Sequence, residues 1–146
     1  MDKITSNSSA ALNDENAILN AVEQFYSALN LTFTGDIELM NEVWSHADDV
    51  TYMGPQGGFQ VGWEKVLEIW KEHTAMHIGG IVKPTDMQIT LGQDIAITHN
   101  YEKGENTSAK GEPQKVSIRA TNIFRKEGEK WKMIGHHTDI LPFLEK

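Results

Sequence analysis

The chain has 146 residues, of which 39% are hydrophobic, and this is enough for one domain with a buried core. It contains no cysteine, so disulfides, thiolate catalysis and cysteine-ligated metal sites are excluded. Its formal net charge of −8 argues against a nucleic-acid partner, because binding to phosphates needs an excess of Lys and Arg.

No apolar run approaches the roughly 20 residues that a membrane-spanning helix needs. The N-terminus also lacks the apolar segment of a secretory signal. We therefore expect a cytoplasmic protein with no membrane partner. Residues 1–12 are polar and small, so we expect a flexible N-terminus there, followed by a single domain over residues 13–146.

Three helices are predicted in the first half of the chain. Asn13 or Asp14 can cap the first helix, and apolar residues then recur at helical spacing as far as Phe33. A short second helix follows Gly35, and a third helix follows Gly62. Four aromatic residues on or near the last two helices are expected to line the pocket described below: Trp44, Tyr52, Trp63 and Trp70.

Strands are predicted from residue 50 onward. Two short strands, 50–53 and 59–61, flank a turn rich in Gly and Pro. From Ile81 the apolar period changes to two, and Gly128 joins the last two strands. The polar segment 103–113 is expected to be an exposed loop. Three helices followed by a mostly antiparallel sheet predict an α+β fold.

Alternation along the last three strands selects the candidate site residues. Each shares a strand face with isoleucines, and if these faces point inward, polar groups converge in a mostly apolar cavity. The residues selected in this way are His99, Tyr101, Asn122, Phe124, His136 and Thr138. A bulge in the last strand would reverse its parity and bring His137, Asp139 and Arg119 into the pocket instead.

One pair of histidines has the spacing of metal ligands. His73 and His77 lie four residues apart on the third helix, which is a zinc-ligand spacing, but no third ligand accompanies them. We therefore expect no metal and no cofactor.

Three segments resemble the SnoaL-like branch of the nuclear transport factor 2-like superfamily. They are GDIELMNEVWSHADDVTYMGP (35–55), the Gly-Trp pair at the third helix, and RATNIFRKEGEKWKMIGHH (119–137). The similarity covers about residues 14–140. The end of the chain is also similar to the association domain of calcium/calmodulin-dependent protein kinase II.

This resemblance implies a cone-shaped fold, in which a curved antiparallel sheet wraps around the long N-terminal helix and encloses an apolar pocket. Members are commonly homodimers that pair through the outer sheet face, so we expect a homodimer that binds a small apolar ligand. Strand parity assigns to that outer face Arg119, Thr121, Ile123, Arg125, Trp131 and Met133.

The superfamily includes ketosteroid isomerases, polyketide cyclases, dehydratases and non-catalytic assembly domains, so the fold does not select a function. The isomerase branch places its general-base Asp directly before a Pro, where this chain has Gly54 before Pro55. The Tyr donor of that branch aligns with Phe25, next to Tyr26. Glycine cannot accept a proton, so steroid isomerisation by that machinery is disfavoured.

Two functions remain open. The first is a small-molecule-binding protein with isomerase-, cyclase- or hydrolase-type acid–base chemistry on a carbonyl-bearing ligand. In that reading His99 or His136 is the general acid or base, and Tyr101 and Asn122 donate hydrogen bonds to a developing oxyanion. The alternative is a non-catalytic dimerising or ligand-sensing module.

Overall fold

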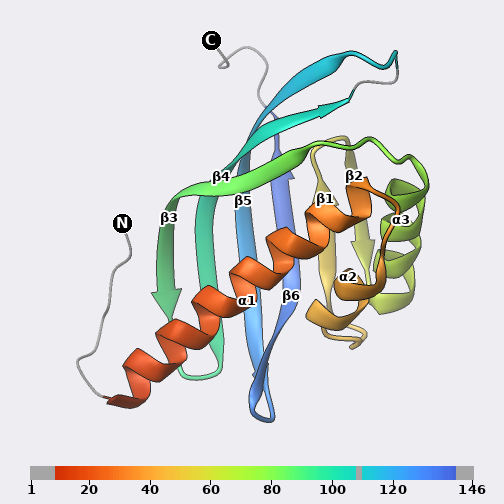
Figure 1. Ribbon diagram of the computed structural model, residues 1–146. Coiled ribbons are helices and arrows are strands. Elements are labelled where there is room, and N and C mark those ends of the chain that lie inside the picture. The colour runs from red at the N-terminus through yellow and green to blue at the C-terminus, as the bar shows by residue number, and fades with distance from the viewer. Residues whose placement is uncertain (1–8, 108–109, 141–146) are drawn as a thin grey trace.

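The computed structural model describes residues 9–107 and 110–140, with side chains from residue 13 onward. A long helix, α1 (Ser9–Phe33), crosses one face of a six-stranded sheet, and two shorter helices lie near one end of it (Figure 1). These are α2 (Glu38–Val43) and α3 (Trp63–Ala75). The strands are β1 (Thr51–Gly54), β2 (Gly57–Val61), β3 (Ile81–Leu91), β4 (Ile95–Thr107), β5 (Pro113–Glu127) and β6 (Lys130–Asp139).

The sheet has the order β2-β1-β6-β5-β4-β3, in which β1 and β6 run parallel and every other neighbouring pair runs antiparallel. The register shifts in β3 between Thr85 and Gln88, and between β5 and β6 at Ile123 and Phe124. Such bulges bend and twist strands. The sheet therefore curves around α1 without closing (Figure 1), which confirms the predicted α+β fold.

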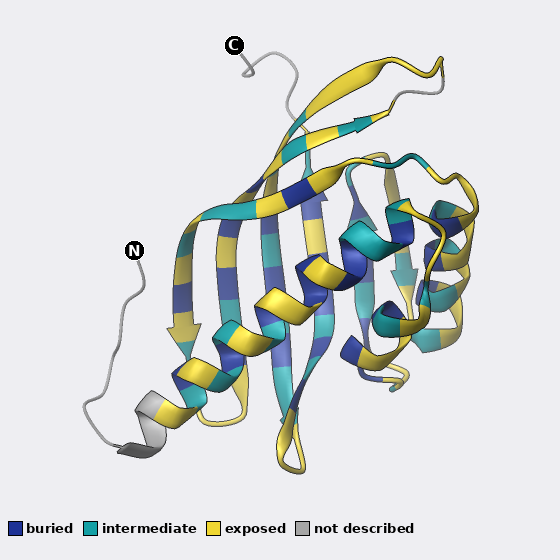
Figure 2. Cartoon of the chain, in the orientation of Figure 1, coloured by how far each residue is buried: buried dark blue, intermediate teal, exposed yellow. Residues whose placement is uncertain are grey.

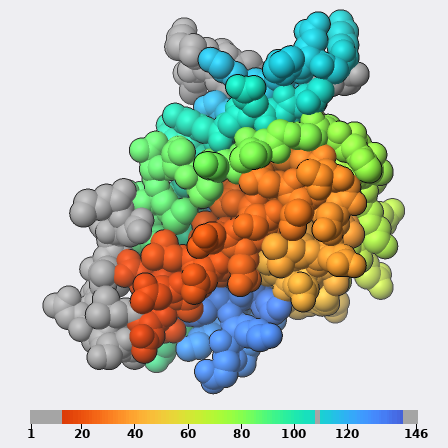
Figure 3. All heavy atoms as spheres, in the orientation of Figure 1, coloured from red at the N-terminus to blue at the C-terminus, as the bar shows by residue number. Residues whose placement is uncertain are grey.

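The helix α1 buries one apolar stripe against the sheet. Ile18, Val22 and Phe25 recur at spacings of three and four residues, and each is at most 2% exposed. Figure 2 shows the alternation of buried and exposed turns along the helix. The Asn30 amide then pairs with the backbone of Val82, donating to its carbonyl at 3.0 Å and accepting from its N–H at 2.8 Å. This holds β3 alongside the end of α1, as Figure 3 shows from outside.

Two predicted boundaries differ from the structure. The helix α1 begins at Ser9, ahead of the expected cap at Asn13 or Asp14, so residues 9–12 are helical. Residues 1–8 lie outside the described part of the chain. The predicted loop at 103–113 is mostly strand, because β4 and β5 keep their pairing as far as Thr107 and Pro113. No helix among the described residues is long and apolar enough to span a membrane.

The predicted parity of β4 is wrong. Thr98, Asn100 and Glu102 point inward and are buried, whereas His99 is exposed and Tyr101 is 41% exposed on the outer face. Burying the polar face costs little here, because its side chains hydrogen-bond to one another and to α1.

The parity of β6 changes along the strand. Phe124 pairs with Met133 while Ile123 pairs with Gly135, so Ile134 is the extra residue of a bulge. The bulge brings Trp131 and Met133 to the inner face together with His136 and Thr138, and all four are buried. The assignment of Trp131 and Met133 to the outer face is therefore wrong.

Candidate functional site

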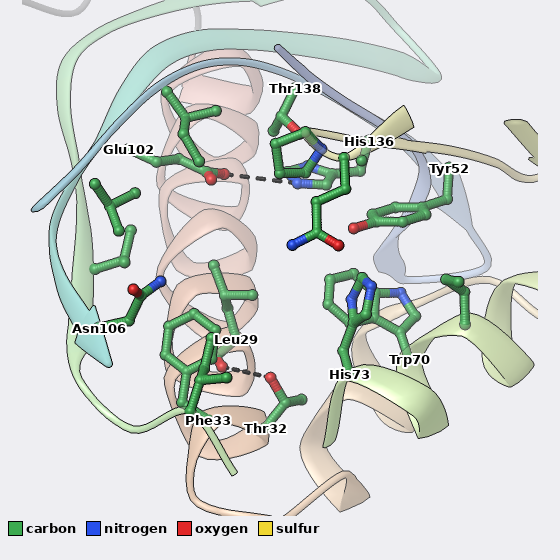
Figure 4. Close-up of a pocket in the computed structure, with 18 of the residues that line it drawn as sticks. Leu29, Thr32, Phe33, Tyr52, Trp70, His73, Glu102, Asn106, His136 and Thr138 are labelled. Atoms are coloured by element: carbon green, nitrogen blue, oxygen red, sulfur yellow. Dashed lines mark hydrogen bonds and ion pairs between the residues drawn. The ribbon is translucent and has the colours of Figure 1, made fainter. Parts of the chain in front are cut away.

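A cavity of about 430 Å³ lies between the inner face of the sheet, α1 and α3 (Figure 4). Its walls are mostly apolar, and among the described residues that line it there is no Lys or Arg. The apolar lining includes Leu29, Phe33, Ile69, Val82, Val116 and Ile118. The polar and aromatic lining includes Tyr52, Gln60, Trp70, His73, Glu102, His136 and Thr138.

The carboxyl group of Glu102 is the acidic group of this cavity. Glu102 is 4% exposed, and the Tyr26 hydroxyl on α1 donates a hydrogen bond of 2.8 Å to Glu102 Oε2. Burial raises the pKa of Glu102 to about 7, although the hydrogen bond from Tyr26 lowers it. A carboxyl group with this pKa gains and loses its proton near neutral pH, which suits a general acid or base.

A chain of hydrogen bonds fixes the protonated nitrogen of His136. Asn100 Nδ2 lies 2.9 Å from the carbonyl oxygen of Tyr101, which can only accept, so the orientation of this amide is determined. Asn100 Oδ1 therefore faces Asn122 Nδ2 at 3.3 Å, and this orients the Asn122 amide in turn. Asn122 Oδ1 lies 2.6 Å from His136 Nδ1. Since Asn122 Oδ1 can only accept, His136 Nδ1 carries the hydrogen.

The other imidazole nitrogen of His136 therefore carries a lone pair that can accept a hydrogen bond. His136 Nε2 lies 3.6 Å from Glu102 Oε2, within ion-pairing distance. Burial lowers the pKa of His136 to about 3, with a smaller contribution from His137, so the imidazole is neutral at ordinary pH. The contact below pH 7 is thus between a carboxylic acid and a neutral imidazole, and not a salt bridge.

Of the two groups, Glu102 is the one that can take up and release a proton near neutral pH. Glu102 is the stronger base of the two, since its pKa is about 7 and that of His136 is about 3. When Glu102 takes up a proton, the lone pair of His136 Nε2 faces the new acid. The arrangement does not resemble a metal site, because among the described residues no group of three His, Cys, Asp or Glu side chains could hold a metal ion.

Aromatic rings build the wall beside this pair. The Tyr52 ring stacks on the imidazole of His136 at 5.7 Å between centroids and 15° between planes. It also lies 4.9 Å from the Trp70 ring. The Trp70 Nε1 and Gln60 Oε1 atoms are buried without a hydrogen-bond partner among the described residues. His73 reaches the cavity from α3, and burial lowers its pKa despite Glu72, so it too is neutral.

The structure brings part of the predicted site together. Four predicted residues line the cavity: Tyr52, Trp70, His136 and Thr138. Asn122 is fully buried behind His136 and orients it. Trp44 and Phe124 belong to the packed core, at 1% exposed each, and Trp63 is half-buried and stacks on His46. Their placement as cavity walls is therefore not supported.

The other predicted groups lie on the opposite side of the sheet. A groove on the outer face is lined by His99, Tyr101, Arg119, His137 and Asp139. Within it, Arg119 and Asp139 form an ion pair of 2.8 Å. This placement contradicts both the inward orientation of His99 and Tyr101 and the alternative in which His137 and Asp139 face the pocket.

Glu102 and Tyr26 are the residues that sequence reasoning missed. Along β4 alone, the isoleucines on the outer face outweigh the polar inner face. A signal exists across strands, because Thr98, Asn122 and His136 stand in one register row of β4, β5 and β6. Polar side chains that follow one another across neighbouring strands indicate a shared buried network.

The chain is similar to known proteins at the level of fold. The model of the SnoaL-like domain matches residues 18–141. No curated protein sequence matches significantly. A Streptomyces avermitilis structure, provisionally described as a dehydratase of the NTF2-like family, superposes with a TM-score of 0.78 at 22% identity, covering 89% of this chain and 97% of that one.

Two further structures have different descriptions. One from Shewanella frigidimarina, provisionally described as a ketosteroid isomerase, gives a TM-score of 0.69 at 20% identity, over 94% of this chain and 98% of that one. The association domain of CaMKII from C. elegans gives 0.68 at 13% identity, over 91% and 100%. Identities this low establish a shared fold and leave activity open. Since the family model covers most of the sequence, the chain belongs to the SnoaL-like domain family.

Proposed function

We propose that this protein is an acid–base enzyme that moves a proton on a small, neutral, carbonyl-bearing ligand. The observation that carries the proposal is the Glu102 carboxyl, buried in an apolar cavity with its pKa near 7 and 3.6 Å from the acceptor nitrogen of His136. Similar folds described as a dehydratase and as an isomerase are consistent with this class of chemistry.

The reaction begins with ionised Glu102. Its carboxylate takes a proton from the carbon next to the ligand carbonyl, the C–H bond breaks, and its electron pair forms an enolate whose charge rests on oxygen. Protonated Glu102 then faces His136 Nε2 and returns the proton to the same or a different carbon. Exchange, isomerisation or elimination of a leaving group follows, depending on the ligand.

The cavity selects against anionic ligands. Since no Lys or Arg lines it among the described residues, a carboxylate or phosphate would be buried without a counter-charge. Its apolar and aromatic walls fit fused rings, and its volume of about 430 Å³ fits a small molecule.

The test is hydrogen–deuterium exchange at the α-carbon of neutral bicyclic ketones such as 1-tetralone, followed by NMR in D₂O. We expect Glu102→Gln to lower the enzymatic rate by about 10² to 10⁴, the usual contribution of a general base. Glu105→Gln is the matched control, because Glu105 lies on the same strand with its side chain exposed. The rate should rise with pH around a midpoint near 7. Equal rates for wild type and Glu102→Gln would refute the proposal.

We also propose a homodimer formed through the outer face of the sheet. The likeness to an association domain favours assembly, and Ile95 is 39% exposed on that face beside half-buried Ile97 and Ile123. A second copy would cover these isoleucines. Light scattering at micromolar concentration should give twice the mass of the chain, and Ile97→Lys should halve it. A monomeric mass for the wild type would contradict this proposal.

A further inference from the structure

We infer that the Tyr52 hydroxyl is the hydrogen-bond donor that receives the reacting carbonyl oxygen of the ligand. This rests on the proposed function, because it supplies the second group that enolate formation requires. Tyr52 stands between Gln60 and His136 in one row across β2, β1 and β6. Its ring stacks on the His136 imidazole, and Figure 4 shows its hydroxyl pointing into the cavity that Glu102 and His136 also face.

The Tyr52 hydroxyl has no hydrogen-bond partner among the described residues. The Tyr26 hydroxyl donates to Glu102 and accepts from Asn100 and Asn122, so it is fully engaged. No described side chain hydrogen-bonds Tyr52, and its pKa is raised by burial and by Glu102. The hydroxyl therefore keeps its proton at every working pH and is available to donate to a ligand in the cavity.

Gly54 keeps the space for this hydroxyl. A Cβ atom built on Gly54 would lie 2.5 Å from Tyr52 Oη, closer than real contacts allow. Gly54 does not have the positive φ that would itself favour glycine, so the close approach of Tyr52 is the physical reason for a residue without a side chain. Gly54, the residue directly before Pro55, has no side chain that could act as a base, and it leaves room for the Tyr52 hydroxyl instead.

The donor and the base act on two parts of the ligand: Tyr52 on the carbonyl oxygen and Glu102 on the hydrogen of the α-carbon. As Glu102 removes the α-proton, negative charge grows on the carbonyl oxygen, and a hydrogen bond from Tyr52 strengthens with that charge. Aimed donors of this kind, held in a water-poor site, contribute about 10² to 10³ in rate each. No proton passes from Tyr52 to the ligand, and none is consumed.

The test uses Tyr52→Phe, which removes only the hydroxyl, and ¹³C=O-labelled 1-tetralone as the probe. In the wild-type complex the carbonyl stretch should move to lower frequency than in an apolar solvent, and in Tyr52→Phe this shift should be lost. The exchange rate should fall by about 10² to 10³. Gly54→Ala, which displaces the hydroxyl, should behave like Tyr52→Phe. Tyr101→Phe, the same change on the outer face, should leave both readings at the wild-type value.

The outcomes separate the two proposals. If Tyr52→Phe leaves the carbonyl frequency and the exchange rate unchanged while Glu102→Gln abolishes exchange, the inference about Tyr52 is wrong and the proposed function stands. If wild type shifts the carbonyl frequency through Tyr52 without any exchange, Tyr52 is a binding donor and the proposed chemistry fails. Failure of wild type to bind the ketone at all would overturn both.

Discussion

At the residue scale, the two buried titratable groups of the cavity have opposite pKa shifts, so their effects on the pH dependence of the free energy of unfolding should cancel. Folding holds Glu102 neutral up to a pKa of about 7 instead of 4.5, and holds His136 neutral down to about 3 instead of 6.5. Between pH 4.5 and 6.5, unfolding therefore releases one proton from Glu102 and takes up one at His136.

Removing one of the two groups should reveal how the other changes the free energy of unfolding with pH. In His136→Gln, the stabilisation associated with neutral Glu102 should be lost as pH rises from about 4.5 to 7. In Glu102→Gln, stability should instead be lost as pH falls from about 6.5 towards 3, because His136 takes up a proton in the unfolded state but stays neutral in the folded state. Each slope should approach about 1.4 kcal/mol per pH unit. Urea denaturation across this range measures them, and parallel curves for the two variants would show that these groups are not coupled to folding.

At the element scale, the sequence predicted the helices and strands well because their signals are local. Helical spacing from Ile18 to Phe33 and alternation from Ile81 onward depend on neighbouring residues alone. The predicted loop at 103–113 failed because strand pairing across β4 and β5 outweighs the polar composition of the segment.

Which face of β4 and of β6 points inward could not be predicted from the sequence. In β4 the outer face carries Ile95, Ile97 and Tyr101, so hydrophobicity alone selects the wrong face. The correct face is decided by partners that lie far away in sequence, namely Tyr26 on α1 and Asn122 on β5. In β6 a one-residue bulge changed the parity midway, and a single sequence gives no signal for its position.

At the scale of the whole molecule, the open curved sheet and α1 create a cavity that a flat sheet could not. The helix contributes Leu29 and Phe33 to its apolar wall, while the sheet contributes Glu102 and His136. From the same helix, the Tyr26 hydroxyl holds the Glu102 carboxyl in place. The arrangement also gives the two sheet faces separate roles, with chemistry proposed inside and assembly outside. A variant of the outer face should therefore change the mass in solution without changing the chemistry of a ligand in the cavity.

The proposed chemistry requires a Glu102 carboxyl group that titrates near neutral pH, and NMR can observe this titration without knowledge of the ligand. The carboxyl carbon of Glu102, assigned by its disappearance in Glu102→Gln, should titrate with a midpoint near 7 because it is buried beside a neutral imidazole. A midpoint near 4.5, the ordinary value for glutamate, would mean that the group is solvated and not poised for proton transfer.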